Sequence, residues 1–159
     1  MTGAGEAHHL RVGIVVSTYH DFVTNRLRDG AVEALRAAGV ADDAMIVAPV
    51  PGAYEIPQAA RRLAAFSRVD AVICLGCLIR GETPHFDIIA SAVAQSITGA
   101  AIDSGVPMTF GVLTTNSAEE ALARAGDGPS NKGREAAEAA LAMVGLFREL
   151  TPQEPEQGG

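Results

Sequence analysis

The sequence contains a single lysine, Lys132, no tryptophan and only two cysteines. Any chemistry that needs a lysine amine must therefore use Lys132. Acidic residues outnumber basic ones and give a formal net charge of −7. Because no surplus of cations is available to neutralise phosphates, we expect neither a nucleic-acid partner nor an anionic membrane partner.

The sequence also lacks long hydrophobic runs. None approaches the roughly 18–20 uncharged residues that a membrane-spanning helix needs. The opening residues, MTGAGEAHHL, show no basic start followed by an apolar stretch, so no secretory signal is expected. Hydrophobic residues make up 48% of the chain and charged residues 19%, which is typical of a globular protein. We predict a cytoplasmic protein with one domain over 1–159 and flexible ends at 1–9 and 151–159.

The two cysteines, Cys74 and Cys77, superficially resemble a redox or metal-binding pair. They lie in the apolar run AVICLGCLI, which predicts a buried strand, and residues three apart in a strand face opposite sides. A metal site would also need further ligands at suitable spacing, and none is evident. We interpret both as packing residues and expect no metal.

Short, mostly β-branched apolar runs alternate with longer stretches of helical spacing. The runs that predict strands are Val12–Val16, Met45–Pro49, Ala71–Ile79 and Met108–Leu113. The stretches that predict helices are Phe22–Ala38, Ile56–Phe66, Phe86–Ser104, Ala118–Ala125 and Arg134–Leu150. Asn116 with Glu119 fits a capping box for the fourth helix.

This alternation predicts a parallel sheet covered by helices on both faces. The expected fold is a three-layer α/β/α sandwich, with a four-stranded parallel sheet in flavodoxin-like, doubly wound topology. In such folds ligands bind outside the carboxyl ends of the strands. That rule selects four loops: Ser17–Asp21, Val50–Glu55, Arg80–His85 and Thr114–Asn116.

The loop Arg80–His85 (RGETPH) carries the most chemistry. A glycine-containing turn that opens a helix offers free backbone N–H groups and a positive dipole end, which suit phosphate. Thr83 adds a hydroxyl, and His85 adds an imidazole, a side chain able to transfer protons at neutral pH. Thr83 and His85 could instead simply cap the helix. Glu82 is unfavourable beside a phosphate unless its carboxylate points away.

For several residues of the other loops, a functional role and a purely structural role are both possible. Tyr19 could contact a ligand or fill the core, and Glu55 could hold a polar ligand or favour the helix dipole. Arg124 and Lys132 add cations late in the chain and could equally be solvated. We expect His20, like the tail pair His8 and His9, to lie in solvent.

Together these segments resemble the lumazine synthase family over Val12–Leu150. The motifs that carry the resemblance are PGAYEIP at Pro51–Pro57, LGCLIRGETPHFD at Leu75–Asp87, FGVLTT at Phe110–Thr115, RAG at Arg124–Gly126 and NKG at Asn131–Gly133. The order GxxIRGxTxHxD is the most specific of them. Two departures are Cys77-Leu78, where a small or β-branched pair is commoner, and His20, where asparagine is frequent.

The resemblance implies an enzyme of riboflavin biosynthesis. It condenses 5-amino-6-(D-ribitylamino)uracil with 3,4-dihydroxy-2-butanone 4-phosphate to give 6,7-dimethyl-8-ribityllumazine, water and phosphate, and no cofactor is expected. It also implies the site residues: Tyr19, Ala53, Tyr54, Glu55, Cys77, Leu78, Ile79, Phe110 and Lys132 for the ribitylaminouracil; Glu82, Thr83 and Arg124 for the phosphate; and His85 for proton transfer.

The resemblance further implies a homopentamer with active sites between adjacent subunits, where Phe110 and Arg124 serve a neighbour's site. The short linker Asp127–Ser130 is similar to that of members which form icosahedral 60-subunit shells. Riboflavin synthase is the expected functional partner. The sequence leaves two alternatives: a flavin- or lumazine-binding shell protein without catalysis, and a flavodoxin-like electron carrier, which the glycine-poor first loop disfavours.

Overall fold

The computed structural model describes residues 7, 9–82 and 84–152, and its centre is a sheet of four parallel strands. The strands are β1 (Val12–Ser17), β2 (Met45–Val50), β3 (Ala71–Ile79) and β4 (Met108–Thr115). All four predicted strands are confirmed, and β1, β2 and β4 extend slightly further at their carboxyl ends. The strand order is β2-β1-β3-β4, so the chain reverses its direction of winding between β1 and β3.

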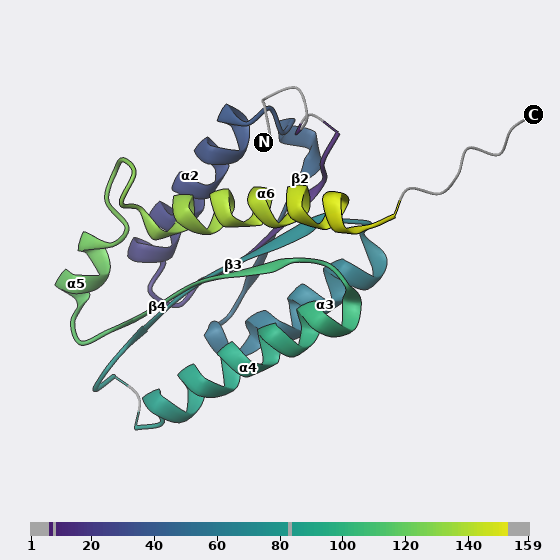
Figure 1. Cartoon of the computed structure of the whole chain (residues 1–159). Coiled ribbons are helices and arrows are strands. Elements are labelled where there is room, and N and C mark those ends of the chain that lie inside the picture. The colour runs from purple at the N-terminus through teal and green to yellow at the C-terminus, as the bar shows by residue number, and fades with distance from the viewer. Residues whose placement is uncertain (1–6, 8, 83, 153–159) are drawn as a thin grey trace, which may run out of the picture.

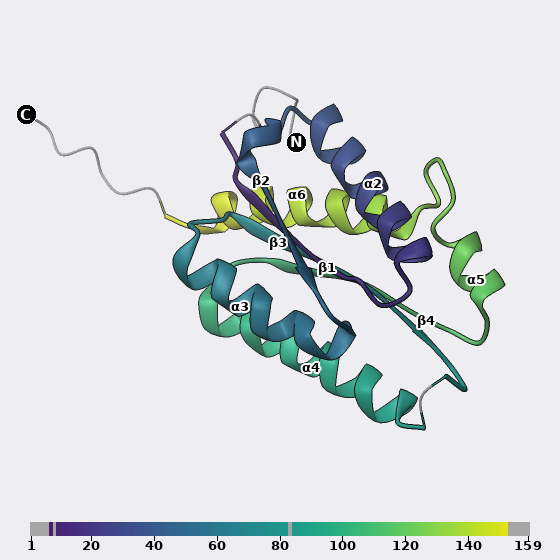
Figure 2. The ribbon, with the colours of Figure 1, turned by 180° about the vertical axis from the view of Figure 1, so that it is seen from behind.

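Helices cover both faces of this sheet, as predicted (Figures 1 and 2). Helices α2 and α6 lie on one face, α3 and α4 lie on the other, and α5 follows the end of β4. The bounds are α2 (Asp21–Ala37), α3 (Ile56–Phe66), α4 (Phe86–Ser104), α5 (Ala118–Ala123) and α6 (Lys132–Leu150), with short 3₁₀ helices η1 (Asp42–Ala44) and η2 (Ala53–Glu55). This is the predicted three-layer α/β/α sandwich of flavodoxin-like topology.

The core consists of two hydrophobic clusters, one on each side of the sheet. Strand β1 is buried throughout and β3 almost throughout, because each has a strand on either side and helices above and below. Alternation along β3 sends Ile73, Leu75 and Cys77 to the α2–α6 side, and Val72 and Cys74 to the α3–α4 side. The prediction that Cys74 and Cys77 face opposite sides is therefore confirmed.

The helix ends follow local chemistry. Pro57 lies in the first turn of α3, as expected from its missing N–H. Helix α6 begins two residues before the predicted Arg134, because the Asn131 side chain accepts a hydrogen bond from the Arg134 N–H and caps the helix. The predicted Asn116–Glu119 capping box is wrong by one position. Ser117 caps α5 by accepting from the Glu120 N–H at 3.1 Å.

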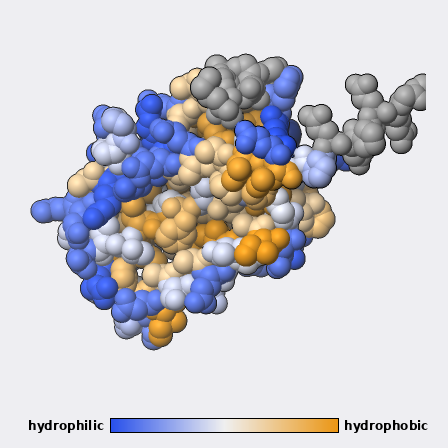
Figure 3. Space-filling model, viewed as in Figure 1, coloured by the Kyte–Doolittle hydropathy of each residue, from blue (hydrophilic) through white to orange (hydrophobic). Residues whose placement is uncertain are grey.

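Several large apolar side chains remain exposed on the single chain. They include Ile88, Ile102, Phe110 and Leu150. Figure 3 shows apolar surface over the middle of one face and near the carboxyl-terminal half of α6. None of the helices in the described residues combines the length and apolarity needed to cross a bilayer. Of the predicted flexible ends, most residues lie outside the described part of the chain; Ala7 is buried in the α2–α6 cluster.

Candidate active site

The four loops that the sequence singled out meet at the carboxyl edge of the sheet. The N–H groups of Thr18 and Tyr19 donate to the carbonyls of Val50 (2.8 Å) and Pro51 (3.1 Å), which joins the first two loops. The Arg80 N–H donates to the Thr115 carbonyl at 2.8 Å and joins the last two. This edge includes the β1–β3 reversal, where doubly wound folds bind ligands.

His20 forms the contact between the first and third loops, and its predicted place in solvent is wrong. Its side chain is only 9% exposed, and its Nε2 lies 3.3 Å from Oε2 of Glu82. The His20 ring also packs between Tyr19 (ring centroids 4.4 Å apart) and Phe22 (5.8 Å). His9 is exposed, as expected for the tail pair, and His8 lies outside the described residues. The sequence alone could not reveal the partner of His20, because Glu82 is distant in the chain.

Tyr19 and the turn between β2 and α3 form one wall of the site. The Tyr19 side chain is exposed, whereas Ala53 is buried. The Glu55 carboxylate lies over Gly52: its Oε1 is 3.3 Å from the position that a Cβ at residue 52 would occupy. Among the described residues this carboxylate forms no capping hydrogen bond with α3. Glu55 is thus directed over the turn rather than into the helix end. Tyr54 is 67% exposed and borders, together with Ala92, Val93 and Ser96 of α4, a cavity of about 250 Å³.

The last residues of β3 form the floor. Cys77, Leu78 and Ile79 pair in register with Leu113, Thr114 and Thr115 of β4. Burial raises the pKa of the Cys77 thiol to about 11, and the charge of Glu82 contributes to the shift. Burial alone raises the pKa of Cys74 to about 12. Neither thiol ionises near neutral pH, so Cys77 can act here as an apolar wall but not as a nucleophile.

Arg80 fixes the loop between β3 and α4. Its guanidinium contacts both oxygens of Asp87 at 3.4 Å, donates from Nε to Asn116 Oδ1 at 3.1 Å, and lies 4.6 Å from the centre of the Phe86 ring. These contacts tie both ends of the loop to the exit of β4. We assigned Arg80 no role from the sequence, although Arg80 and Asp87 both belong to the most specific motif.

This loop carries three predicted site residues. Glu82 is half exposed, and its N–H donates to the Ile79 carbonyl at 3.3 Å. His85 is exposed and occupies the N-cap position of α4, but among the described residues its side chain forms no capping hydrogen bond with that helix. The alternative that His85 serves as a side-chain cap is therefore disfavoured. Thr83 lies outside the described residues.

The remaining three candidates line a different place. Phe110, Arg124 and Lys132 border a cavity of about 490 Å³ along the edge of β4, against the start of α6. The Arg124 carbonyl accepts from the Lys132 N–H at 2.9 Å, and each cation has a carboxylate nearby: Glu120 Oε1 lies 3.6 Å from Arg124, and Glu135 Oε2 lies 2.8 Å from Lys132. Two cations beside an aromatic ring suit a planar or phosphorylated ligand.

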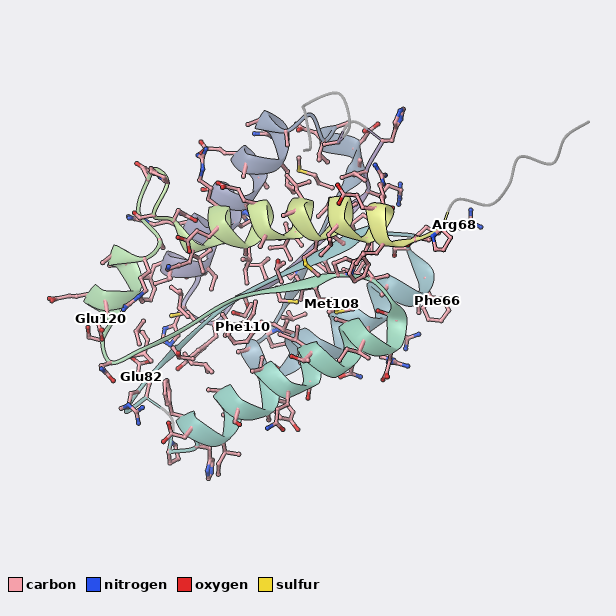
Figure 4. All side chains as sticks on the ribbon, viewed as in Figure 1. Phe66, Arg68, Glu82, Met108, Phe110 and Glu120 are labelled. Atoms are coloured by element: carbon pink, nitrogen blue, oxygen red, sulfur yellow. The ribbon has the colours of Figure 1, made fainter. Side chains whose placement is uncertain are left out.

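Within one chain the two groups of candidates remain apart. Of the described candidates, only Phe110, Arg124 and Lys132 line the β4 cavity. Phe110 pairs with Cys74, three residues before Cys77, which corresponds to about 10 Å along the strand. Figure 4 shows Phe110 midway along β4, whereas Glu82 lies beyond the end of β3. The described members of the two groups therefore do not line one common cavity within a single chain.

The NKG motif separates into structural and site residues. Asn131 is buried, and its Nδ2 donates to the carbonyls of Arg26, Ala125 and Gly126 at 3.0–3.2 Å. Gly133 lies against the backbone of Leu27 in α2. Only Lys132 faces the cavity. Among the described residues no group of three or more His, Cys, Asp or Glu side chains is arranged to hold a metal ion.

Comparison with known proteins identifies the family of this chain. Residues 9–148 match the family described as 6,7-dimethyl-8-ribityllumazine synthase. The chain is 46% identical over 144 residues to a 6,7-dimethyl-8-ribityllumazine synthase of Syntrophus aciditrophicus (strain SB), an alignment that covers 91% of this chain and 94% of that relative. The chain therefore belongs to the 6,7-dimethyl-8-ribityllumazine synthase family, which confirms the predicted enzyme of riboflavin biosynthesis.

Proposed function

We propose that this synthase carries out its condensation at a site shared between two copies of the chain. One copy supplies the loops at the carboxyl ends of β1, β2 and β3. The other supplies the cavity along β4 with Phe110, Arg124 and Lys132. The observation that carries the proposal is that, within a single chain, the two groups of family-motif residues do not line one common cavity.

The first copy binds 5-amino-6-(D-ribitylamino)uracil. Tyr19 stacks on the pyrimidine ring, while the partner's Phe110 forms the opposite wall. The turn at Ala53–Glu55 holds the ribityl chain and ring through main-chain groups and the Glu55 carboxylate, which is directed over this turn. The main chain of Cys77, Leu78 and Ile79 lines the floor. Lys132 of the partner lies near the substrates.

The second substrate, 3,4-dihydroxy-2-butanone 4-phosphate, binds between the copies. Its phosphate meets the loop at Glu82 and Thr83, before the positive end of α4, with Arg124 of the partner as a clamp. The amine of the first substrate attacks the ketone carbonyl, and the imine forms with loss of one water, so no enzyme lysine is needed. His85 transfers protons as phosphate leaves by elimination, and ring closure onto the remaining carbonyl releases a second water. Much of the acceleration comes from holding the two substrates in reacting geometry.

Exposed apolar side chains support the presence of a second copy. Ile88 and Ile102 on α4 are 69% and 75% exposed, and Phe110 on β4 is 46% exposed. Strand β4 is also a sheet edge, whose outer main-chain groups need a partner or solvent. We propose a homopentamer in which each copy contributes one half to each of two sites. Assembly into an icosahedral shell, with riboflavin synthase as a cytoplasmic functional partner, is proposed from the short 127–130 linker and the family resemblance.

Mixing two strongly impaired variants tests the shared site. One chain carries Tyr19→Ala with His85→Ala, and the other carries Arg124→Ala. In pentamers refolded from equal amounts, a quarter of the interfaces, roughly one half times one half, pair two intact halves. We expect the mixture to form lumazine at about a quarter of the rate of the same amount of unmutated protein. Each variant alone should remain far below this rate.

Each outcome has a distinct meaning. Activity of the mixture equal to the mean of the two separate variants would show that each site lies within one chain. An unmutated protein that binds 6,7-dimethyl-8-ribityllumazine without forming it from the two substrates would identify a binding protein instead. Light scattering on the unmutated chain distinguishes a pentamer from a 60-subunit shell.

A further inference from the structure

His20 is a nearly buried histidine at the reversal point of the sheet, and the catalytic scheme above gives it no task. Its ring lies between those of Tyr19 and Phe22, and its Nε2 is 3.3 Å from the Glu82 carboxylate. The contact crosses from the β1 exit to the loop that precedes α4. A side chain held by two aromatic rings is well placed to position that loop.

The backbone at His20 explains how the ring reaches this place. The residue adopts a left-handed conformation with φ of 63°, and its carbonyl accepts from the N–H groups of Val23 (2.9 Å) and Thr24 (3.0 Å) in the first turn of α2. Histidine, asparagine and aspartate tolerate this conformation better than other side chains with a Cβ. The ring is thus aimed by a fixed turn at the start of the helix.

Glu82 presents an electrostatic problem that His20 can solve. Its main chain borders the proposed phosphate site, and a carboxylate there repels a phosphate dianion. The charge of Glu82 also acts on the buried Cys77 thiol, because it contributes to the raised pKa of that group. A protonated His20 would neutralise this charge, and the contact holds the carboxylate on the β1 side of the loop.

We propose that His20 is a positioning residue of this synthase: it holds the Glu82 side chain aside and compensates its charge, so that the ketone phosphate can bind at the loop. The inference rests on the proposed phosphate site. It predicts that affinity for the ketone phosphate is higher with a protonated than with a neutral imidazole at position 20. The charged groups concerned are Glu82, from the loop packed against the ring, and Asp21, the next residue on its own helix.

His20→Asn tests the proposal, because asparagine tolerates the left-handed turn but provides no ring and no titratable group. At pH 6.5 we expect KM for the ketone phosphate to rise about five-fold, as for loss of one partly exposed charge contact, with kcat changed less than about two-fold. KM for the ribitylaminouracil should change less than about two-fold, because Tyr19 keeps its backbone bond to Pro51.

Glu82→Gln provides the matched control. With the carboxylate removed, replacing His20 should no longer matter, so Glu82→Gln and the double variant should share one KM within about two-fold. The ratio of KM between pH 8.5 and pH 6.5 should be smaller in Glu82→Gln than in the unmutated enzyme. This second measurement leaves His20 in place and so does not depend on how well His20→Asn folds.

Two results would overturn the proposal while leaving the synthase reaction intact. One is an equal rise in KM on replacing His20 with and without the Glu82 carboxylate, which would indicate a purely structural role. The other is an unchanged ratio of KM between the two pH values in Glu82→Gln. Failure of the unmutated enzyme to saturate with the ketone phosphate would instead contradict the proposed site itself.

Discussion

Asn131 should be the most costly single polar side chain to remove from this fold. Its Oδ1 caps α6 by accepting from the Arg134 N–H at 3.0 Å, and its Nδ2 meets three carbonyls from α2 and the α5–α6 turn. Replacing an N-cap asparagine by alanine costs about 1 kcal/mol. The Asn131 amide group has two hydrogens to share among the three carbonyls, and losing each of these two donors adds about 1 kcal/mol. We expect Asn131→Ala to lower the free energy of unfolding by about 3 kcal/mol.

Gly30 makes this prediction sharper, because its neighbour in space is the Asn131 carboxamide. A Cβ at residue 30 would overlap that carboxamide, so Gly30→Ala alone should destabilise the fold by about 1–3 kcal/mol. In the Asn131→Ala background the overlap disappears, and the helix preference for alanine should stabilise α2 by about 1 kcal/mol. The effect of Gly30→Ala therefore changes sign between the two backgrounds.

Urea unfolding followed by far-UV circular dichroism measures these differences, at one protein concentration because assembly adds to apparent stability. Asn25→Ala, at an exposed position on α2, is the matched control and should change stability by less than about 0.5 kcal/mol. Gly30→Ala that destabilises equally in both backgrounds would refute the contact. So would an Asn131→Ala no less stable than the control.

Three further predictions concern the helix contact, the catalysis and the thiol. Gly133→Ala should destabilise the protein by at least about 2 kcal/mol in urea unfolding, because a Cβ would collide with the Leu27 backbone carbonyl; unchanged stability would contradict this close approach. In steady-state assays His85→Ala should weaken lumazine formation without abolishing it, and Arg124→Ala should reduce it more. Normal saturation with the ketone phosphate in both variants would argue against the proposed roles of Arg124 and His85. Cys77 should resist thiol reagents at pH 8 until the protein is unfolded, since burial raises its pKa to about 11. The neutral buried thiol contributes fully to stability below the unfolded pKa of about 8.5. This contribution is lost as the pH rises towards 11 and the thiol ionises.

The sequence predicted the elements well because their signals are local. The apolar run at Ala71–Ile79 and the helix at Ile56–Phe66 have the same bounds in the structure. Helix ends were less predictable, as the shift of the α5 cap from Asn116 to Ser117 shows. Neighbouring residues in that turn can all accept a hydrogen bond, and the choice among them depends on how β4 leaves the sheet.

The loops of the site could also be predicted, but not the contacts between them. Parallel strands place their carboxyl ends together, so the alternation of strands and helices was enough to select four loops. The partner of His20 could not be read from the sequence, because the contact depends on a left-handed turn and on a loop far along the chain. The buried role of Asn131 was missed for the same reason: its bond to Arg26 joins residues 105 positions apart.

The sequence by itself determined the layered α/β fold, through short-range periodicity, and the family, through motifs whose order and spacing survive in one dimension. The tertiary structure decided which motif residues share a place. It set Tyr19, Glu55, Glu82 and His85 at the carboxyl edge of the sheet and left Phe110, Arg124 and Lys132 on the outer edge of β4. The physical reason is that a rigid sheet fixes distances along and across its strands. Whether two residues meet therefore depends on strand order and register, which only the folded chain specifies.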